Sequence, residues 1–165
     1  GSISPFERMQ VTVNYTNEVT APFEESFFVR VAKETLMRCP LVGLKDKKEI
    51  IMSVVAVSKE KIQELNTTYR QQPRVTDILS FGEYADMAAF EQDTTEHIFL
   101  GEIFFCYDVI VAASEEDQVT IEHELIYIFS HGVLHLLGYD HSDEMFSLQD
   151  AVTEFFVEVS SKTNT

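Results

Sequence analysis

The chain has 165 residues, of which 45% are hydrophobic and 12% aromatic, and this composition excludes a wholly disordered protein. No run approaches the ~20 consecutive apolar residues that a membrane-spanning helix needs. A formal net charge of -16 argues against a protein that coats itself in nucleic acid. We therefore expect a single domain over residues 1–165 that makes no membrane contact.

The cysteines and the N-terminal residues bear on the cellular compartment. Cys39 and Cys106 form no Cys-x-x-Cys motif and are too few for a disulfide framework, so we expect both to be reduced and buried. The N-terminal residues do not have the pattern of a secretory signal, and Gly1-Ser2 resembles a cloning remnant. These features predict a cytoplasmic protein.

The charged residues are unevenly distributed along the chain. Residues 1–80 hold 11 Lys and Arg against 10 Asp and Glu, a net of +1, whereas residues 81–165 hold one lysine and 18 acids, a net of -17. Any polyanion should therefore place its phosphates along the first half. The basic residues available there include Arg30, Lys33, Lys45, Lys47, Lys48, Arg70 and Arg74.

Hydrophobic patterns in the first half predict three strands and two helices. The strands are expected at residues 9–16, 49–57 and 77–81, and the helices at residues 23–37 and 58–70. Ser58 is a suitable N-cap for the second helix, and Pro73 prevents its continuation. Residues 82–96 are acidic and show no clear period, so we expect a loop there that can include a helical turn.

The second half continues with a strand and three helices. The strand is expected at residues 97–105 and the helices at residues 108–116, 121–137 and 143–160. The helix over 121–137, with Thr120 as its cap and Gly138 as its stop, is apolar almost all round, which is typical of a central buried helix. The last helix should turn Leu148, Val152, Phe155, Phe156 and Val159 inward. The predicted fold class is α+β, a small mixed four-stranded sheet flanked by about five helices.

Three of the five histidines fall within residues 131–141. His131 and His135 are four residues apart, so on a helix both imidazoles project from one face and can bind one metal ion. Gly138 can adopt the left-handed conformation that ends a helix and lets His141 return to the same ion. Three neutral imidazoles leave a fourth coordination position open, as in catalytic zinc sites. We predict that the central buried helix binds Zn²⁺ or another divalent transition metal.

The pattern differs from the His-Glu-x-x-His motif of zinc proteases. Gly132 stands where those enzymes carry the glutamate that acts as general base, which weakens the interpretation as a peptidase. The glycine also allows another element to approach the helix closely. His97 and His123 lie outside the motif, and we expect them to be structural or exposed to solvent.

The whole segment from His131 to His141 resembles the signature of the YbeY endoribonuclease family, the ribosomal RNA maturation factors of bacteria and organelles. Residues 65–70, 76–81 and 100–103 resemble further blocks of that family in the same order and spacing, so the resemblance extends from about residue 9 to 160. Glu102 departs from the pattern, because the family has aspartate there.

The resemblance implies both an activity and its residues. It makes His131, His135 and His141 ligands of one Zn²⁺ and Arg70 a functionally important arginine. The implied activity is metal-dependent cleavage of single-stranded RNA in the maturation of small-subunit ribosomal RNA and in ribosome quality control. Ribosomal RNA is the implied partner, with ribosomal proteins or a ribosome-associated GTPase as further partners.

The remaining candidate residues come from the sequence itself. Asp77 and Asp140 are the nearest carboxylates that could orient a histidine or assist proton transfer, although Asp140 could equally bind backbone amides in its turn. Arg70 could bind a phosphate through two N–H groups. Two alternatives to the endoribonuclease stay open: a zinc hydrolase of another substrate, and a non-catalytic metal-stabilised factor that docks on the ribosome through its acidic half.

Overall fold

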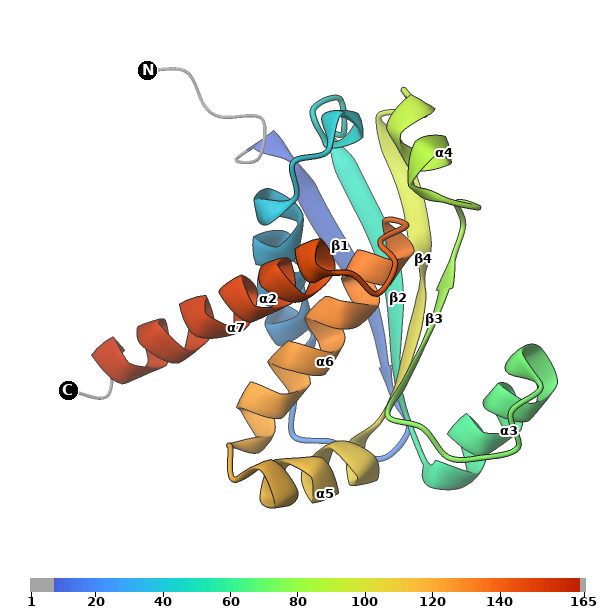
Figure 1. Cartoon of the computed structure of the whole chain (residues 1–165), viewed down its shortest axis with the longest axis vertical. Helices are drawn as coiled ribbons and strands as arrows, with labels where there is room; N and C mark the ends of the chain where they lie inside the picture. The colour runs from blue at the N-terminus through green and yellow to red at the C-terminus, as the bar shows by residue number, and fades with distance from the viewer. Residues whose placement is uncertain (1–7, 164–165) are drawn as a thin grey trace.

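The computed structural model describes residues 8–163 and shows a mixed four-stranded sheet with helices on both faces (Figure 1). The predicted cloning remnant, Gly1-Ser2, lies outside the described residues. The strands are β1 (Gln10–Asn17), β2 (Glu49–Val57), β3 (Ile78–Gly82) and β4 (His97–Cys106). The helices are α2 (Glu25–Arg38), η1 (Val42–Leu44), α3 (Lys59–Arg70), α4 (Met87–Gln92), α5 (Tyr107–Asp117), α6 (Ile121–Leu136) and α7 (Asp143–Thr163).

The order of strands in the sheet is β1-β2-β4-β3. The first three of these run parallel, with Ile50 opposite Ile98, and β3 joins β4 antiparallel as an edge strand, with Ile78 opposite Phe105. The fold class is therefore α+β with a mixed sheet, as predicted. Because β4 lies between β2 and β3, the residues at the end of α3 lie beside β3 at one edge of the sheet.

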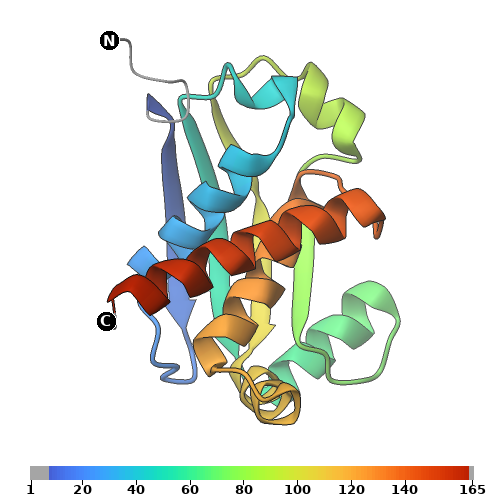
Figure 2. The same ribbon diagram turned by 60° about the vertical axis from the view of Figure 1, so that its left-hand side comes forward.

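The two faces of the sheet are covered very differently. Helices α2 and α6 pack on one face with α7 crossing them, and they enclose the main hydrophobic core (Figure 2). The other face carries α3, over a small cluster formed by Val57, Ile62, Leu79 and Cys106, against which Val109 of α5 also packs. Both cysteines, Cys39 and Cys106, are buried and unpaired, as expected.

Most predicted helix boundaries agree with the structure. Ser58 and Thr120 cap their helices, accepting hydrogen bonds from the backbone N–H groups of Lys61 (3.1 Å) and His123 (3.0 Å). The segment 82–96 contains the short helix α4, because the Asp86 side chain accepts a hydrogen bond from the backbone N–H of Ala89 and caps it; the sequence analysis allowed a helical turn here.

The prediction for α7 was partly wrong. Phe155 and Val159 are exposed rather than inward, whereas Gln149 and Thr153 are buried against the rest of the molecule. The inward face begins at Met145 and continues through Gln149 and Val152. Leu148 and Phe156 are partly buried against the core, as predicted, whereas Phe155, Val157 and Val159 are exposed. Among the described residues, no helix is long and apolar enough to cross a membrane.

Candidate metal centre

Helix α6 holds His131 and His135 at the open end of the core. Nine of its sixteen residues are buried, so the helix is fixed from several sides. Gly132 lies between the two histidines and against β3. A Cβ atom there would come within 2.8 Å of Ile78 Cδ1 and 3.1 Å of Ser80 Oγ. The glycine therefore lets the ligand-bearing part of α6 pack directly on the edge strand.

The chain reverses immediately after α6. Gly138 has φ +99, a conformation that L side chains rarely adopt, and a Cβ atom there would collide with the backbone of Met87. Its N–H donates to the carbonyl oxygen of His135 (3.0 Å), and the next N–H, of Tyr139, donates to that of Leu134 (3.1 Å). The Tyr139 ring is buried and anchors the turn. This turn returns His141 to the other two histidines, as predicted.

The three histidines meet through the same ring atom. The Nε2 atoms of His131 and His135 are 2.9 Å apart, and those of His135 and His141 are 3.1 Å apart. The Nε2 atoms of His141 and His131 are 3.2 Å apart. Three ligands at about 2.0–2.1 Å around a tetrahedral ion would be separated by about 3.3 Å, close to these distances.

Neighbouring groups fix the tautomers of two of these rings. Gln149 Nε2 donates to the carbonyl oxygen of Tyr127 (2.9 Å), so its Oε1 atom faces His131 Nδ1 as an acceptor at 3.3 Å. His135 Nδ1 lies 3.0 Å from the carbonyl oxygen of Tyr139. The hydrogen-bond network thus assigns the hydrogen of each neutral ring to Nδ1 and leaves a lone pair on each Nε2.

Burial and the neighbouring rings disfavour the charged form of these two imidazoles. Burial lowers the pKa of His131, and the charge of His141 lowers it further. Burial and the charge of His131 likewise lower the pKa of His135. Lone pairs that face one another at 2.9 Å repel unless a cation lies between them. The donor atoms, their tautomers and their spacing therefore fit a metal ion, and the cluster can hold one.

The histidines open into a cleft of about 640 Å³. Among the described residues, Arg70 is the only lysine or arginine that lines it. The other residues of its wall come from the α3–β3 segment, from the loop after β3 and from the turn after α6; they include Asn66, Asp77, Ser80, Tyr84, Asp86 and Asp140. The cleft thus brings together all six site residues that the sequence indicated.

Arg70 is held in place at the rim of this cleft. One guanidinium N–H group donates to the carbonyl oxygen of Ser80 (2.6 Å), and the guanidinium carbon lies 4.9 Å from the centre of the Phe81 ring. Ser80 and Phe81 are consecutive residues of β3, so a single strand supplies both contacts. This arrangement leaves further N–H groups of the fork for an anion.

The two predicted carboxylates line the cleft without contacting a histidine by hydrogen bond. Asp77 Oδ1 lies 3.4 Å from the Thr76 hydroxyl, and Asp140 is exposed in the turn. The orienting role considered for them is filled by Gln149 and by the carbonyl group of Tyr139. Sequence reasoning missed Gln149, although a polar residue on the inward face of α7 between Met145 and Val152 was a usable signal.

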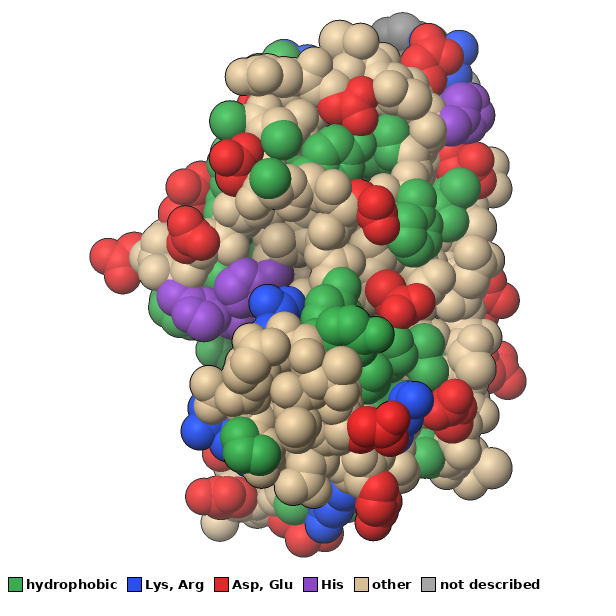
Figure 3. Space-filling view, turned by 90° about the vertical axis from the view of Figure 1, so that its right-hand side faces the viewer, with side chains coloured by type: hydrophobic (Ala, Val, Ile, Leu, Met, Phe, Trp, Pro, Cys, Tyr) green, Lys and Arg blue, Asp and Glu red, His purple; other side chains and the backbone are tan. Residues whose placement is uncertain are grey.

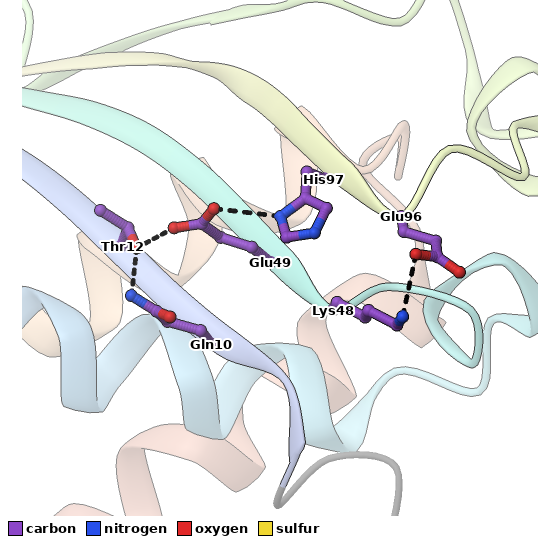
Figure 4. Close-up of polar contacts among 6 residues, drawn as sticks. All are labelled: Gln10, Thr12, Lys48, Glu49, Glu96 and His97. Atoms are coloured by element: carbon purple, nitrogen blue, oxygen red, sulfur yellow. Dashed lines mark hydrogen bonds and ion pairs between the residues drawn. The ribbon is translucent and has the colours of Figure 1, made fainter.

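The other histidines and lysines singled out in the sequence lie elsewhere. His97 is exposed and pairs with Glu49, whereas Lys48 pairs with Glu96 near one end of β2 and β4 (Figure 4). Lys47 is buried and donates to the carbonyl oxygen of Asp93. His123 lies outside the cleft. Of the seven basic residues expected to attract phosphates, Arg70 alone lines the cleft.

Comparison with known proteins identifies the relatives of this chain. The family model described as Endoribonuclease YbeY matches residues 14–156. The endoribonuclease YbeY of Ureaplasma urealyticum is 34% identical over 142 residues, which cover 83% of this chain and 86% of that protein. That of Oenococcus oeni is 41% identical over 115 residues, covering 66% and 73%.

A solved structure supports the same assignment. The solution structure of a Thermotoga maritima protein superposes with a TM-score of 0.58 at 29% sequence identity, covering 92% of this chain and 93% of that one. Likeness in sequence and in fold thus extends over most of the chain, including the histidine segment and the strands that support it. The resemblance drawn from the sequence motifs is confirmed: the chain belongs to the endoribonuclease YbeY family.

Proposed function

We propose that this chain is a zinc-dependent endoribonuclease that cleaves single-stranded RNA in the maturation of small-subunit ribosomal RNA and in ribosome quality control. One observation carries the proposal: three imidazole Nε2 atoms converge in a cleft whose only basic side chain among the described residues is Arg70. A metal-ligand set and a phosphate ligand in one cleft are the groups that phosphodiester hydrolysis requires. Membership of an endoribonuclease family supports RNA as the substrate.

Zn²⁺ would be held by His131, His135 and His141. A three-histidine zinc site supplies a nucleophile at neutral pH by lowering the pKa of water to ~7, and it polarises a phosphoryl oxygen. Hydrogen bonds within the chain set the tautomers of two of these ligands. Gln149 and the carbonyl oxygen of Tyr139 keep the hydrogen of two rings on Nδ1, so both Nε2 lone pairs are available.

Arg70 would bind the scissile phosphate and stabilise the charge that develops on it. Its contacts with Ser80 and Phe81 fix the guanidinium before substrate arrives, so less rotamer entropy is lost on binding. Asp77 and Asp140, which both line the cleft, would assist proton transfer. Burial lowers the pKa of His131 and His135, and the charges of Asp77 and Asp140 oppose part of this effect at His131 and His135, respectively.

The charge of the cleft supports a single strand rather than a duplex. A duplex carries two rows of phosphates and needs several cations to neutralise them. The cleft has Arg70 as its one cation among the described residues, and Asp77, Asp86 and Asp140 also line it. Because these three aspartates outnumber the one cation, ribosomal RNA in this cleft would be positioned with help from ribosomal proteins or a ribosome-associated GTPase. The cytoplasmic location inferred from the cysteines belongs to the same proposal.

Four proteins of equal folding test the proposal: wild type, His135→Ala, Arg70→Ala and Lys59→Ala. Lys59→Ala is the matched control, because it removes the same charge from the opposite end of α3. We expect one zinc per wild-type chain by mass spectrometry and cleavage of single-stranded RNA but not of casein. His135→Ala should lose zinc and activity. Arg70→Ala should keep zinc and lose roughly 10²-fold in kcat/KM.

Two results would overturn the proposal. Equal cleavage by all four proteins would show that a contaminating nuclease is responsible. Full zinc loading without any cleavage of RNA by the wild type would instead indicate the non-catalytic metal-stabilised factor. Circular dichroism of each variant establishes that a loss of activity does not come from unfolding.

A further inference from the structure

A further pocket lies on the face of the sheet that α3 covers, beside the edge strand β3. It has a volume of about 310 Å³ and is lined by Leu65, Tyr69, Phe81, Glu102 and Phe104. The aromatic rings form a continuous series: the ring centres of Tyr69 and Phe81 are 5.5 Å apart, and those of Phe81 and Phe104 are 6.0 Å apart. Tyr69 is 60% exposed, so one side of the series faces solvent.

Arg70 connects this aromatic pocket with the metal cleft. Side chains alternate along β3, so Ser80 lies on the α6 side, close to Gly132, while Phe81 lies on the other side in the aromatic pocket. Arg70 lines the metal cleft and at the same time stacks on Phe81. Figure 3 shows a basic side chain between the histidines and a hydrophobic patch on one face of the molecule.

Glu102 is the one charged residue among the described residues that line the aromatic pocket. The residue lies directly opposite Phe81 in the antiparallel pair of β3 and β4. Within the described residues no hydrogen bond or ion pair engages its carboxylate. A phosphate would be repelled there, whereas a flat ligand that carries N–H donors on its edge would be attracted. The pocket therefore suits the base of a nucleotide better than its backbone.

We propose that the aromatic pocket binds the base of a nucleotide next to the scissile phosphate and that it prefers guanine. The inference rests on the proposed function, since it places the phosphate of the same strand at Arg70. Unstacked bases of single-stranded RNA stack on aromatic rings, and Tyr69, which is 60% exposed, offers such a ring. An ionised carboxylate only accepts hydrogen bonds.

Guanine fits this carboxylate better than the other bases do. Its Watson–Crick edge presents two adjacent donors, N1–H and the N2 amino group, which match the two oxygens of Glu102. Adenine and cytosine each present one amino donor beside an acceptor nitrogen, and uracil presents one N–H between two carbonyl groups. A bidentate pair of this kind typically gives about tenfold discrimination or more.

The first test varies the base. We would measure kcat/KM on short oligouridines that carry one guanosine, inosine or adenosine at each position in turn. Inosine retains N1–H and lacks the N2 amino group. We expect one position at which guanosine is preferred to adenosine by about tenfold, with inosine between them. Glu102→Gln should abolish this preference, and Glu115→Gln, which removes an acidic charge from α5, should retain it.

The second test varies the ring. Tyr69→Ala should raise KM by about tenfold and leave kcat unchanged, because stacking is lost equally in the ground state and the transition state. Tyr69→Phe keeps the ring and should behave as wild type. A variant that merely disturbed Arg70 would lower kcat instead, so the split between KM and kcat separates stacking from an indirect structural effect.

The outcomes distinguish this inference from the proposed function. RNA cleavage with no preference for guanosine at any position overturns the aromatic pocket as a base site and leaves the nuclease standing. Absence of RNA cleavage overturns the proposed nuclease activity. In that case, fluorescence anisotropy of labelled oligouridines with and without guanosine tests whether the aromatic pocket binds a base. Binding that still depends on guanosine and on Glu102 supports the base site, and binding that is independent of both overturns it.

Discussion

The two helices that carry the candidate site are held to the molecule very differently. Helix α6 buries nine of its sixteen residues between β3, β4, α2 and α7, and it supplies His131 and His135. Helix α3 buries only Ile62 and Asn66 of its twelve residues, and it supplies Arg70. The metal ligands therefore come from the most firmly packed helix, whereas the proposed phosphate ligand comes from a helix on the sparsely covered face.

This difference fits separate roles for the two helices, metal binding for α6 and RNA binding for α3. A metal ion requires its ligands within a few tenths of an ångström, and a buried helix provides that precision. A flexible single strand requires a surface that it can reach and leave, and loosely packed elements open more easily than the core. The edge strand β3 joins the two regions, because it touches Gly132 on one side and Arg70 on the other.

The largest effect, on zinc affinity, should come from Gln149, which contacts the proposed metal ligand His131 and is not itself a ligand. In Gln149→Leu, His131 loses the acceptor that holds its hydrogen on Nδ1, and the ring becomes free to rotate or change tautomer. We expect zinc affinity to fall by about 10- to 100-fold. Competition with a chromophoric chelator measures that affinity.

Thr153→Val is the matched control for Gln149→Leu. Thr153 is also a buried polar residue of α7, one turn further along, and its hydroxyl donates to the carbonyl oxygen of Gln149. Its replacement removes one hydrogen bond from the same helix face and leaves the histidines untouched. An equal loss of zinc affinity in the two variants would contradict a specific role for Gln149.

A smaller effect is expected where α6 meets β3. In Gly132→Ala, higher helix propensity contributes about 1 kcal/mol, while the new Cβ atom lies 2.8 Å from Ile78 Cδ1 and forces a shift that costs about 1–3 kcal/mol. We expect the free energy of unfolding in urea to fall by about 1 kcal/mol. The double variant with Ile78→Val, which lacks the crowded methyl group, should recover most of that loss. Simple additivity of the two changes would show that α6 and β3 are not coupled through this contact.

The same division explains what the sequence could predict. All three histidines lie in one helix and the turn that follows it, so local spacing and Gly138 were sufficient to bring them together. The partner of His131 could not be predicted in this way, because Gln149 reaches it from another helix across the core. The aromatic pocket was also invisible, since it needs α3, β3 and β4 side by side.

Charge shows a similar limit. The charge count predicts that any phosphate meets the first half of the chain, but charge alone does not distinguish the seven basic residues there. Tertiary structure separates them: Lys47 and Lys48 hold the end of the sheet together with Asp93 and Glu96, whereas Arg70 reaches the cleft. The relation between a charge and a site depends on the order of the strands, which the sequence pattern did not determine.

The smallest effect, on the free energy of unfolding, should come from Tyr84, which lines the cleft but belongs to neither α3 nor α6. The Tyr84 hydroxyl donates to Asp93 Oδ2 (2.5 Å), and this bond, together with those from Thr95, lowers the pKa of Asp93 to about 2. A carboxyl whose pKa is lower in the folded chain adds stability above its unfolded pKa, near 4, and that stability disappears as the pH falls toward 2.

Tyr84→Phe should therefore be less stable than wild type in a pH-dependent way. The difference in free energy of unfolding should be constant above about pH 5 and should shrink between about pH 4 and 2, where wild-type Asp93 becomes protonated. Protonation of the histidines affects both proteins alike and cancels in the difference.

Tyr69→Phe, which removes a hydroxyl that makes no hydrogen bond within the described residues, should show no such change. Urea unfolding at a series of pH values measures both. A Tyr84→Phe difference that stayed constant down to pH 2 would show that Asp93 does not depend on this bond, and the rim would then be held by the packing of Tyr84 on Phe90 alone.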